Sequence, residues 1–298
     1  MNYRFLGKSG LQVSQVGFGC MSLGENEADN TRLLLYAAEL GINFFDTADI
    51  YQQGQNEITV GKALKEKRKD IIIATKVGNQ LKADGNGWDW NPRKEYILTA
   101  VNKSLQRLQT DYIDLYQLHG GTINDPVDET IEAFEILKKQ GKIRFYGISS
   151  IRPNVIRAYA YRSNTCSVMM QYSLLDRRPE ETCFSLLQDK SIGVLARGSL
   201  AGGLLVNKSV KSYLNYSETE VKKAALAISN ASSAKRGNSQ TALQFVLQQP
   251  AVCAAIVGIR TTEQLKDTVQ AIDTTPLTEI ELQLLRRAVA VNYYKEHR

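Results

Sequence analysis

The chain has few cysteines and no long hydrophobic run. Its cysteines, only four in 298 residues, are scattered without C-x-x-C spacing, and they read as small apolar residues. This distribution argues against a zinc site and against a disulfide framework. No apolar run reaches about 18 residues, and the N-terminal segment MNYRFLGKSG lacks the apolar region and cleavage site of a signal peptide. We therefore expect a cytoplasmic protein with no metal and no membrane partner.

The excess of positive over negative charge is small. The chain has 37 Lys and Arg against 31 Asp and Glu, a net charge of +6. The basic residues alternate with acidic ones and form no stripe with aromatic side chains, which argues against nucleic acid as a partner. A local pocket for a phosphorylated ligand would still suit this excess.

The composition is that of an ordinary globular protein, with 43% hydrophobic and 23% charged residues. Length alone suggests two domains, but α/β barrels reach this size as one domain. No Pro/Gly/Ser-rich linker divides the chain, so we expect one domain over residues 1–298.

A segment from residue 41 to residue 76 predicts one parallel βαβ unit. An apolar strand at 42–45 stops at Asp46, a helix follows at about 57–65, and a second strand at 71–75 stops at Lys76. Tyr51 lies in the turn after the first strand. These three residues should therefore meet at one edge of the sheet.

The same alternation continues along the chain and predicts an α/β fold, a (β/α)8 TIM barrel with an N-terminal β-hairpin and extra C-terminal helices. The competing doubly wound sheet would show G-x-G-x-x-G before a helix, whereas the chain has GFGCMSLG followed by polar residues. A polar loop is expected over residues 79–92. The eight strands are expected at 16–19, 42–45, 71–75, 113–118, 143–149, 167–171, 192–197 and 254–257, and helices at 30–40, 57–65, 93–108, 127–140, 153–162, 179–190, 218–234 and 239–248.

Barrel active sites lie at the carboxyl ends of the strands, so the residues that end each strand are the candidates. Only one of them, Asp46, is a carboxylate, which argues against a divalent-metal site and a glycosidase pair. A Schiff-base aldolase with Lys76 as nucleophile stays open, although a neighbouring carboxylate would keep that lysine charged. The strand-end candidates are Gly19, Met21, Asp46, Lys76, His119, Ser149, Ser150, Gln171, Arg197, Gly258 and Arg260.

A tyrosine beside a lysine and an aspartate predicts acid–base chemistry. A free phenol has a pKa near ~10, and an adjacent ammonium lowers it, while a carboxylate keeps the ammonium charged. His119, one of two histidines, follows a strand and should face the same mouth. Each residue alone is as readily a cap or a solvated strand end. Their coincidence favours function.

Asp46, Tyr51, Lys76 and His119, in the contexts FFDTADIY, IIIATK and LYQLHG, resemble the catalytic tetrad of the aldo-keto reductases. The resemblance extends from GFGCMSLG through GISSIRPNVIR to GIRTTEQL. It implies a barrel that binds NADPH without a Rossmann motif and transfers hydride to an aldehyde or ketone. On this model Tyr51 donates the proton, Lys76 lowers its pKa, Asp46 holds Lys76 and His119 orients the carbonyl oxygen.

The resemblance also implies a set of cofactor residues. Ser149, Ser150 and Gln171 match the clamp on the nicotinamide carboxamide, and Arg197 stands where many members have a stacking tyrosine. Arg260 is the implied clamp on the 2′-phosphate, which favours NADPH over NADH. The full expected set adds Gly19, Met21, Asp46 and Gly258 at the strand ends, Gly198, Ser199, Leu200 and Gly202 at the pyrophosphate, and Gln264, Asp267 and Thr268 at the adenosine.

The expected substrate is a small carbonyl compound, contacted by Tyr51, His119, Trp88 and Trp90; a homo-oligomer is compatible with the sequence. The alternative is a regulatory or scaffold protein that binds NADPH with little turnover. The intact tetrad argues against that alternative, because a sensor needs no proton donor.

Overall fold

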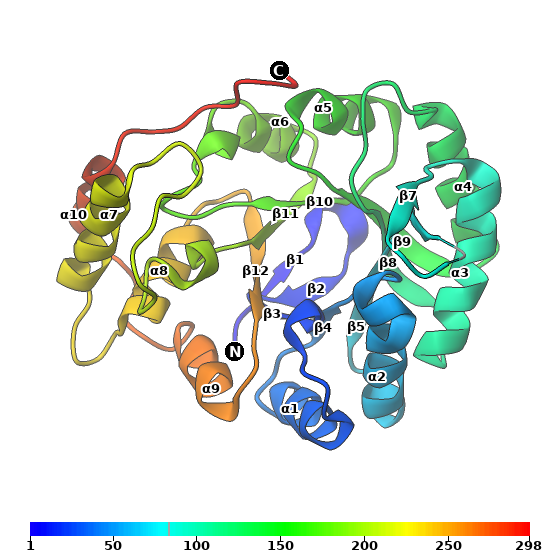
Figure 1. Cartoon of the computed structure of the whole chain (residues 1–298), viewed down its shortest axis with the longest axis horizontal. Helices are drawn as coiled ribbons and strands as arrows, with labels where there is room; N and C mark the ends of the chain where they lie inside the picture. The colour runs from blue at the N-terminus through cyan, green and yellow to red at the C-terminus, as the bar shows by residue number, and fades with distance from the viewer. Residues whose placement is uncertain (83) are drawn as a thin grey trace.

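The computed structural model describes residues 1–82 and 84–298, and eight parallel strands in it close into a barrel (Figure 1). Ala83, in the loop expected at 79–92, lies outside the described residues. The (β/α)8 prediction is confirmed. Around the barrel the strands are β3 (Val16–Gly19), β4 (Phe44–Asp46), β5 (Ile72–Val77), β8 (Ile113–Leu118), β9 (Ile143–Ser149), β10 (Ser167–Gln171), β11 (Gly193–Arg197) and β12 (Val252–Gly258).

Helices surround the barrel and cover the outer face of its strands (Figure 1). In α4 the buried side chains Val127, Thr130, Phe134 and Leu137 follow the helical repeat and face inward. Strands between a barrel interior and a ring of helices are buried on both faces, which explains their continuous apolar runs. The helices are α1 (Glu27–Glu39), α2 (Gln55–Leu64), α3 (Lys94–Leu108), α4 (Val127–Lys139), α5 (Pro153–Arg162), α6 (Cys183–Asp189), α7 (Glu218–Ala231), α8 (Asn238–Leu247), α9 (Thr262–Gln270) and α10 (Glu279–Ala288). Among the described residues, none of these helices has both the length and the apolar character needed to cross a bilayer.

Some element boundaries differ from the prediction for local reasons. Helix α1 begins three residues early because the Asn26 side chain accepts a hydrogen bond from the Asp29 amide at 3.1 Å and caps it. The helix expected at 179–190 is a 3₁₀ turn, Arg178–Glu180, followed by α6.

The expected loop at 79–92 is a small antiparallel sheet rather than a loop, which corrects the prediction. Strand β6 (Asn79–Leu81) pairs with β7 (Trp88–Trp90). Each strand has only three residues, which is too short for an alternation of apolar and polar side chains to signal a strand. This hairpin stands at the rim of the barrel.

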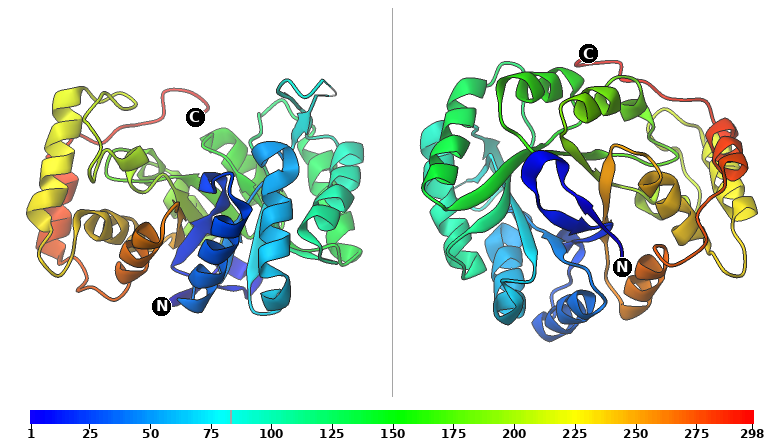
Figure 2. Two further views of the ribbon diagram at one scale, coloured as in Figure 1. Left: turned by 60° about the horizontal axis from the view of Figure 1, so that its bottom comes forward. Right: turned by 180° about the vertical axis from the view of Figure 1, so that it is seen from behind.

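An N-terminal hairpin closes one end of the barrel. Strand β1 (Tyr3–Phe5) pairs with β2 (Gln12–Ser14), and seen from behind the pair lies across the barrel (Figure 2). Leu6 and Leu11 are buried there, and a guanidinium nitrogen of Arg4 donates to the carbonyl of Val252 at 2.6 Å. Because Val252 begins β12, the hairpin covers the amino ends of the strands and leaves the carboxyl ends open.

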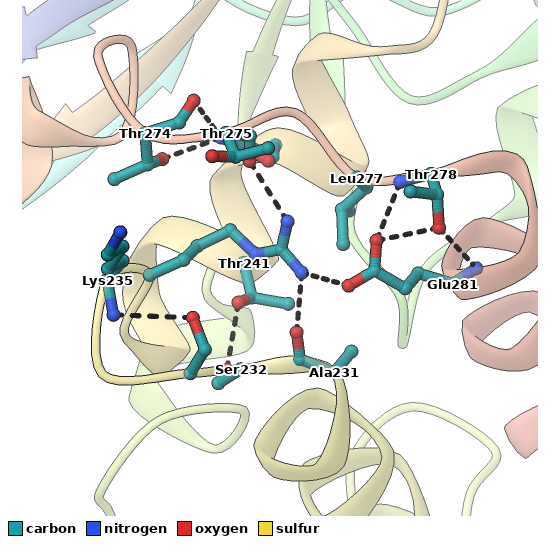
Figure 3. Close-up of polar contacts among 12 residues, drawn as sticks. Ala231, Ser232, Lys235, Thr241, Thr274, Thr275, Leu277, Thr278 and Glu281 are labelled. Atoms are coloured by element: carbon teal, nitrogen blue, oxygen red, sulfur yellow. Dashed lines mark hydrogen bonds and ion pairs between the residues drawn. The ribbon is translucent and has the colours of Figure 1, made fainter.

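Buried Arg236 ties the C-terminal helices together. Its guanidinium donates to the carbonyls of Ala231 at 2.6 Å and Thr275 at 3.0 Å, and pairs with Glu281 (Figure 3). Glu281 also accepts from the amide and hydroxyl of Thr278, which caps α10. The loop between α7 and α8 is thereby fixed to α10, away from the barrel axis.

Candidate active site

A cavity of about 830 Å³ opens at the carboxyl ends of the barrel strands. This is where (β/α)8 enzymes place their active sites, and the volume is that of a small-molecule site. The expected tetrad lies in its wall with many of the other candidates. The cavity is lined by Gly19, Met21, Asp46, Tyr51, Lys76, Trp88, Trp90, His119, Ser149, Ser150, Arg197, Gly198 and Gly258, and also by Ser22, Ile50, Asn79, Gly120, Gly121, Thr122, Ile151, Arg152, Met169 and Ile256.

Lys76, at the end of β5, is the centre of the tetrad. Its side chain is 1% exposed, and its ammonium donates to Asp46 Oδ2 at 2.7 Å, to the Thr47 carbonyl at 2.6 Å and to the Tyr51 hydroxyl at 3.3 Å. An ammonium has three N–H groups, and these three acceptors use all of them. The lysine is therefore held as a cation with a fixed direction.

The carboxylate of Asp46 is fixed in turn. Gln117 Nε2 donates to its second oxygen at 3.2 Å. The Thr47 hydroxyl donates to Asn56 Oδ1 at 2.7 Å, and Asn56 Nδ2 donates to the Cys20 carbonyl at 2.9 Å. Asn56, in the first turn of α2, thus joins the loops after β3 and β4.

Tyr51 is presented by a strained turn. The two residues after it, Gln52 and Gln53, have φ values of 49° and 55°, in the left-handed region that side chains other than glycine avoid. This turn directs the phenol toward Lys76 rather than into α2. The ring meets that of His119 edge to face, with centroids 5.8 Å apart and an interplanar angle of 79°.

The pKa of Tyr51 is raised, whereas the sequence predicted that it would be lowered. Burial raises it above the ordinary value, and the positive charge of Lys76 lowers it by less than burial raises it. Burial alone would lower the pKa of Lys76, but Asp46 and Tyr51 together raise it. At neutral pH, Tyr51 is consequently a neutral phenol that accepts a hydrogen bond from a charged lysine.

His119, directly after β8, is a neutral imidazole. Burial, followed by the positive charges of Lys76 and Arg197, lowers its pKa to about 3. Its backbone amide donates to the Val77 carbonyl at 2.7 Å, and its Nδ1 is buried without a hydrogen-bond partner among the described residues. A neutral imidazole in the wall can donate to a carbonyl oxygen.

The tryptophans form one wall of the cavity. Trp90 is held by a hydrogen bond from its Nε1 to Asp125 Oδ1 at 3.0 Å, and Trp88 is 51% exposed. The Trp90 ring lies against Gly78, whose φ is 120° and whose missing Cβ would come within 2.7 Å of the ring. Glycine at 78 is thus required both by the backbone and by the tryptophan.

Eight expected cofactor residues lie outside the lining of this cavity, among the described residues: Gln171, Ser199, Leu200, Gly202, Arg260, Gln264, Asp267 and Thr268. Asp267 accepts from the Ser239 hydroxyl and from Gln240 Nε2, the latter at 3.0 Å, and Thr268 is buried. These contacts join α9 to α8. Arg260 and Gln264 are exposed beside β12, where the Arg260 amide donates to Gln264 Oε1 at 2.9 Å.

The residues after β11 fit a dinucleotide. The Ser199 hydroxyl is buried without a hydrogen-bond partner among the described residues, so it has a free donor. At Gly202, with φ of 66°, a Cβ would meet nothing within 4 Å, which leaves room for a ligand against the backbone. The hydroxyls of Ser149 and Ser150 and the guanidinium of Arg197 add donors suited to an amide and to phosphates.

Comparison with known proteins agrees with this geometry. The model of the Aldo/keto reductase family matches residues 15–290. The chain belongs to this family. Uncharacterized oxidoreductase YqkF from Bacillus subtilis (strain 168) is 50% identical over 307 residues, covering 100% of both proteins. L-galactose dehydrogenase from Arabidopsis thaliana is 32% identical over 300 residues, covering 93% of this chain and 88% of that protein.

Solved aldo-keto reductases share the fold along the whole chain. The structure of AKR11C1 from Bacillus halodurans in its holo form has a TM-score of 0.94 at 52% identity, covering 100% of this chain and 99% of that one. Its apo form has a TM-score of 0.87 at 50% identity, with the same coverage. The present structure is therefore more similar to the holo form.

Several polar residues of this aldo-keto reductase site were not predicted from the sequence, among them Gln117, Asn79, Arg152 and Asn56. Gln117 lies two positions before His119, so strand alternation would have placed it on the same face of β8. Asn79 and Arg152 follow strand ends closely, a signal that could have been used. Asn56 acts from a helix, and no pattern in the sequence marks it.

Proposed function

We propose that this protein reduces aldehydes or ketones to alcohols with NADPH, and that Tyr51 supplies the proton. One observation supports this above all: Lys76 donates its third N–H to the Tyr51 oxygen. A phenol oxygen that accepts from a cation has its own O–H free for another acceptor. The acceptor in the proposal is the oxygen of the substrate carbonyl.

The protonation states suit a reduction. Burial keeps the pKa of Tyr51 above its ordinary value, so the phenol still carries its proton at neutral pH. The pKa of His119 at about 3 leaves an uncharged imidazole that can hold the carbonyl oxygen beside Tyr51. As negative charge develops on that oxygen, Tyr51 gives up its proton and Lys76 stabilises the phenolate that remains.

The cofactor would supply the hydride, and the chain offers residues on several strands to hold it. Ser149, Ser150 and Gln171 would hold the nicotinamide amide, and the backbone at Gly198 and Ser199 would approach the pyrophosphate. Arg197 would stack on the ring or pair with a phosphate. Greater similarity to the holo form of AKR11C1 than to its apo form supports a preformed cofactor site.

Turnover of a reactive aldehyde tests the proposal against the scaffold alternative. The purified protein is mixed with NADPH and 4-nitrobenzaldehyde, and NADPH loss is followed by absorbance while cofactor binding is measured by titration. An enzyme oxidises NADPH only when the aldehyde is present. Tight NADPH binding with no turnover across a panel of aldehydes and ketones would instead favour the scaffold function.

Preference for NADPH tests the role of Arg260. We expect NADPH to bind at least about tenfold more tightly than NADH, as one charge-assisted contact would give. Replacing Arg260 by Ala should remove most of that difference and leave NADH binding nearly as it was. Equal dissociation constants of NADPH and NADH for the wild type would contradict the role proposed for Arg260.

A further inference from the structure

The cavity has two opposite walls. The order of strands around the barrel places β5, β8 and β9 across from β11, β12 and β3. Arg197, Gly258 and Gly19, which are cofactor candidates, end the second group. Ser149 and Ser150, at the end of β9, are cofactor candidates too, and other lining residues follow the strands of the first group. They include Trp88, Trp90, Gly120, Gly121, Ile151 and Arg152.

Positive charge in the lining exceeds negative charge. Asp46 is the one acidic residue among the described residues that line the cavity, and it is paired with Lys76. Arg152 and Arg197 also line it, and within the described part of the chain neither forms an ion pair. His119 is neutral, so two guanidinium charges stay uncompensated, Arg152 after β9 and Arg197 at the end of β11.

Arg152 is fixed close to the site of reaction. One of its terminal nitrogens donates to the carbonyl of Gly121, two residues after His119. A guanidinium has five N–H groups, and the others have no partner among the described residues. The nearby carboxylate of Asp125 is engaged by the Thr122 amide at 2.7 Å, the Thr122 hydroxyl at 2.7 Å and Trp90 at 3.0 Å.

The rest of this wall is apolar. The two tryptophans and Ile151 line the same cavity as the tetrad and Arg152. A ligand that lies on this wall would have its polar carbonyl at Tyr51 and His119, an apolar body against the rings, and a second polar group at Arg152. An unpaired planar guanidinium is best matched by a carboxylate, which it can bind through two parallel hydrogen bonds.

We propose that Arg152 selects carbonyl substrates that carry a carboxylate, separated from the carbonyl by an apolar body such as an aromatic ring. This inference rests on the proposed carbonyl reduction, of which it names the substrate class. Arg152 binds the carboxylate and takes no part in the chemical step. Arg197, which ends β11, is left to the cofactor.

Binding without cofactor tests the site apart from turnover. Both tryptophans of the chain lie in this wall, so intrinsic fluorescence reports on it. We expect 4-methylbenzoate to bind roughly tenfold or more tightly than its neutral isostere 4-methylbenzamide, as for a hydrogen bond to a charged group. The variant Arg152→Gln should abolish the difference and Arg152→Lys should restore part of it. The control Arg162→Gln, at the other end of α5, should keep it.

Kinetics give the second readout. With NADPH, the ratio of kcat/KM for 4-carboxybenzaldehyde to that for 4-methylbenzaldehyde should fall about tenfold in Arg152→Gln, mainly through KM, and stay as in the wild type in Arg162→Gln. An unchanged ratio, or a loss confined to NADPH binding, overturns the proposal. If neither aldehyde reacts, carbonyl reduction itself fails, and the fluorescence titration still decides whether Arg152 binds carboxylates.

Discussion

At the scale of single residues, the state of Tyr51 depends on the competition between burial and Lys76. The lysine has all three N–H groups engaged, which holds it as a cation and makes it unsuitable as a Schiff-base nucleophile. That removes the aldolase alternative left open by the sequence. The sequence predicted that Lys76 lowers the pKa of Tyr51. In the structure Lys76 does lower this pKa, but burial raises it by more.

Asp46→Asn tests how Lys76 keeps its charge. Asp46 raises the pKa of Lys76 while burial lowers it, so without the carboxylate Lys76 should lose its proton at lower pH. We expect the alkaline decline of kcat to move down by at least about one pH unit. The profile is measured between pH 6 and pH 10 with saturating NADPH. A decline at the wild-type pH, with only a lower plateau, would contradict this role.

Residue types at strand ends could be read from the sequence because a parallel barrel brings all carboxyl ends of its strands to one face. This placed Asp46, Lys76, His119 and Arg197 correctly in the cavity wall. The partner contacts of Asp267 and the burial of Thr268 could not be read, because they depend on how α9 packs on α8. The net pKa of Tyr51 was missed for a similar reason, since burial is a tertiary property.

At the scale of secondary-structure elements, the long periodic helices and strands were predictable and the rim was not. Helices such as α3 and α4 carry regular apolar stripes, so packing and sequence pattern agree. The β6–β7 hairpin and the turn after Tyr51 have no such pattern. The hairpin is held by specific contacts instead, the hydrogen bond of Trp90 to Asp125 and the packing of its ring against Gly78.

Gly78→Ala tests how the β6–β7 hairpin is set against the cavity. A Cβ at residue 78 would clash with the Trp90 ring, and a φ of 120° is strained for alanine. We expect a shift in tryptophan fluorescence, a higher KM for aromatic aldehydes and a loss of about 1–3 kcal/mol in stability. Gly85→Ala is the matched control, because its φ is also positive at 74° but its Cβ would meet nothing within 4 Å. Equal effects of both variants would show that Trp90 does not depend on Gly78.

At the scale of the whole molecule, the two ends of the barrel have different roles: one contributes to stability and the other holds the candidate active site. The N-terminal hairpin lies across the amino ends of the strands (Figure 2). Its leucines are buried there, and the candidate site occupies the carboxyl ends. Apart from the hairpin at its rim, this arrangement was predictable from the alternation of elements and from the fold's general rule for active sites. The clamp at Arg236 that fixes the C-terminal helices was not, because a buried arginine has no sequence signature.

Leu6→Ala tests that division. Leu6 is fully buried under the barrel, and its truncation should cost about 2–5 kcal/mol of stability by leaving a cavity. Because the site lies at the other end, kcat and KM at 25 °C should stay within about twofold of the wild type. Urea unfolding and steady-state kinetics on one preparation give both values. A large change in KM with little loss of stability would contradict the division.

The most direct test of the account is the reduction of 4-nitrobenzaldehyde by Tyr51→Phe. Phenylalanine keeps the ring against His119 and removes only the hydroxyl that Lys76 contacts. We predict a loss of kcat of roughly 10²- to 10⁴-fold, the usual contribution of a positioned acid, with the NADPH dissociation constant nearly unchanged. Tyr161→Phe, at an exposed tyrosine, is the control and should behave as the wild type. A Tyr51→Phe variant that reduces the aldehyde at the wild-type rate would contradict the central claim.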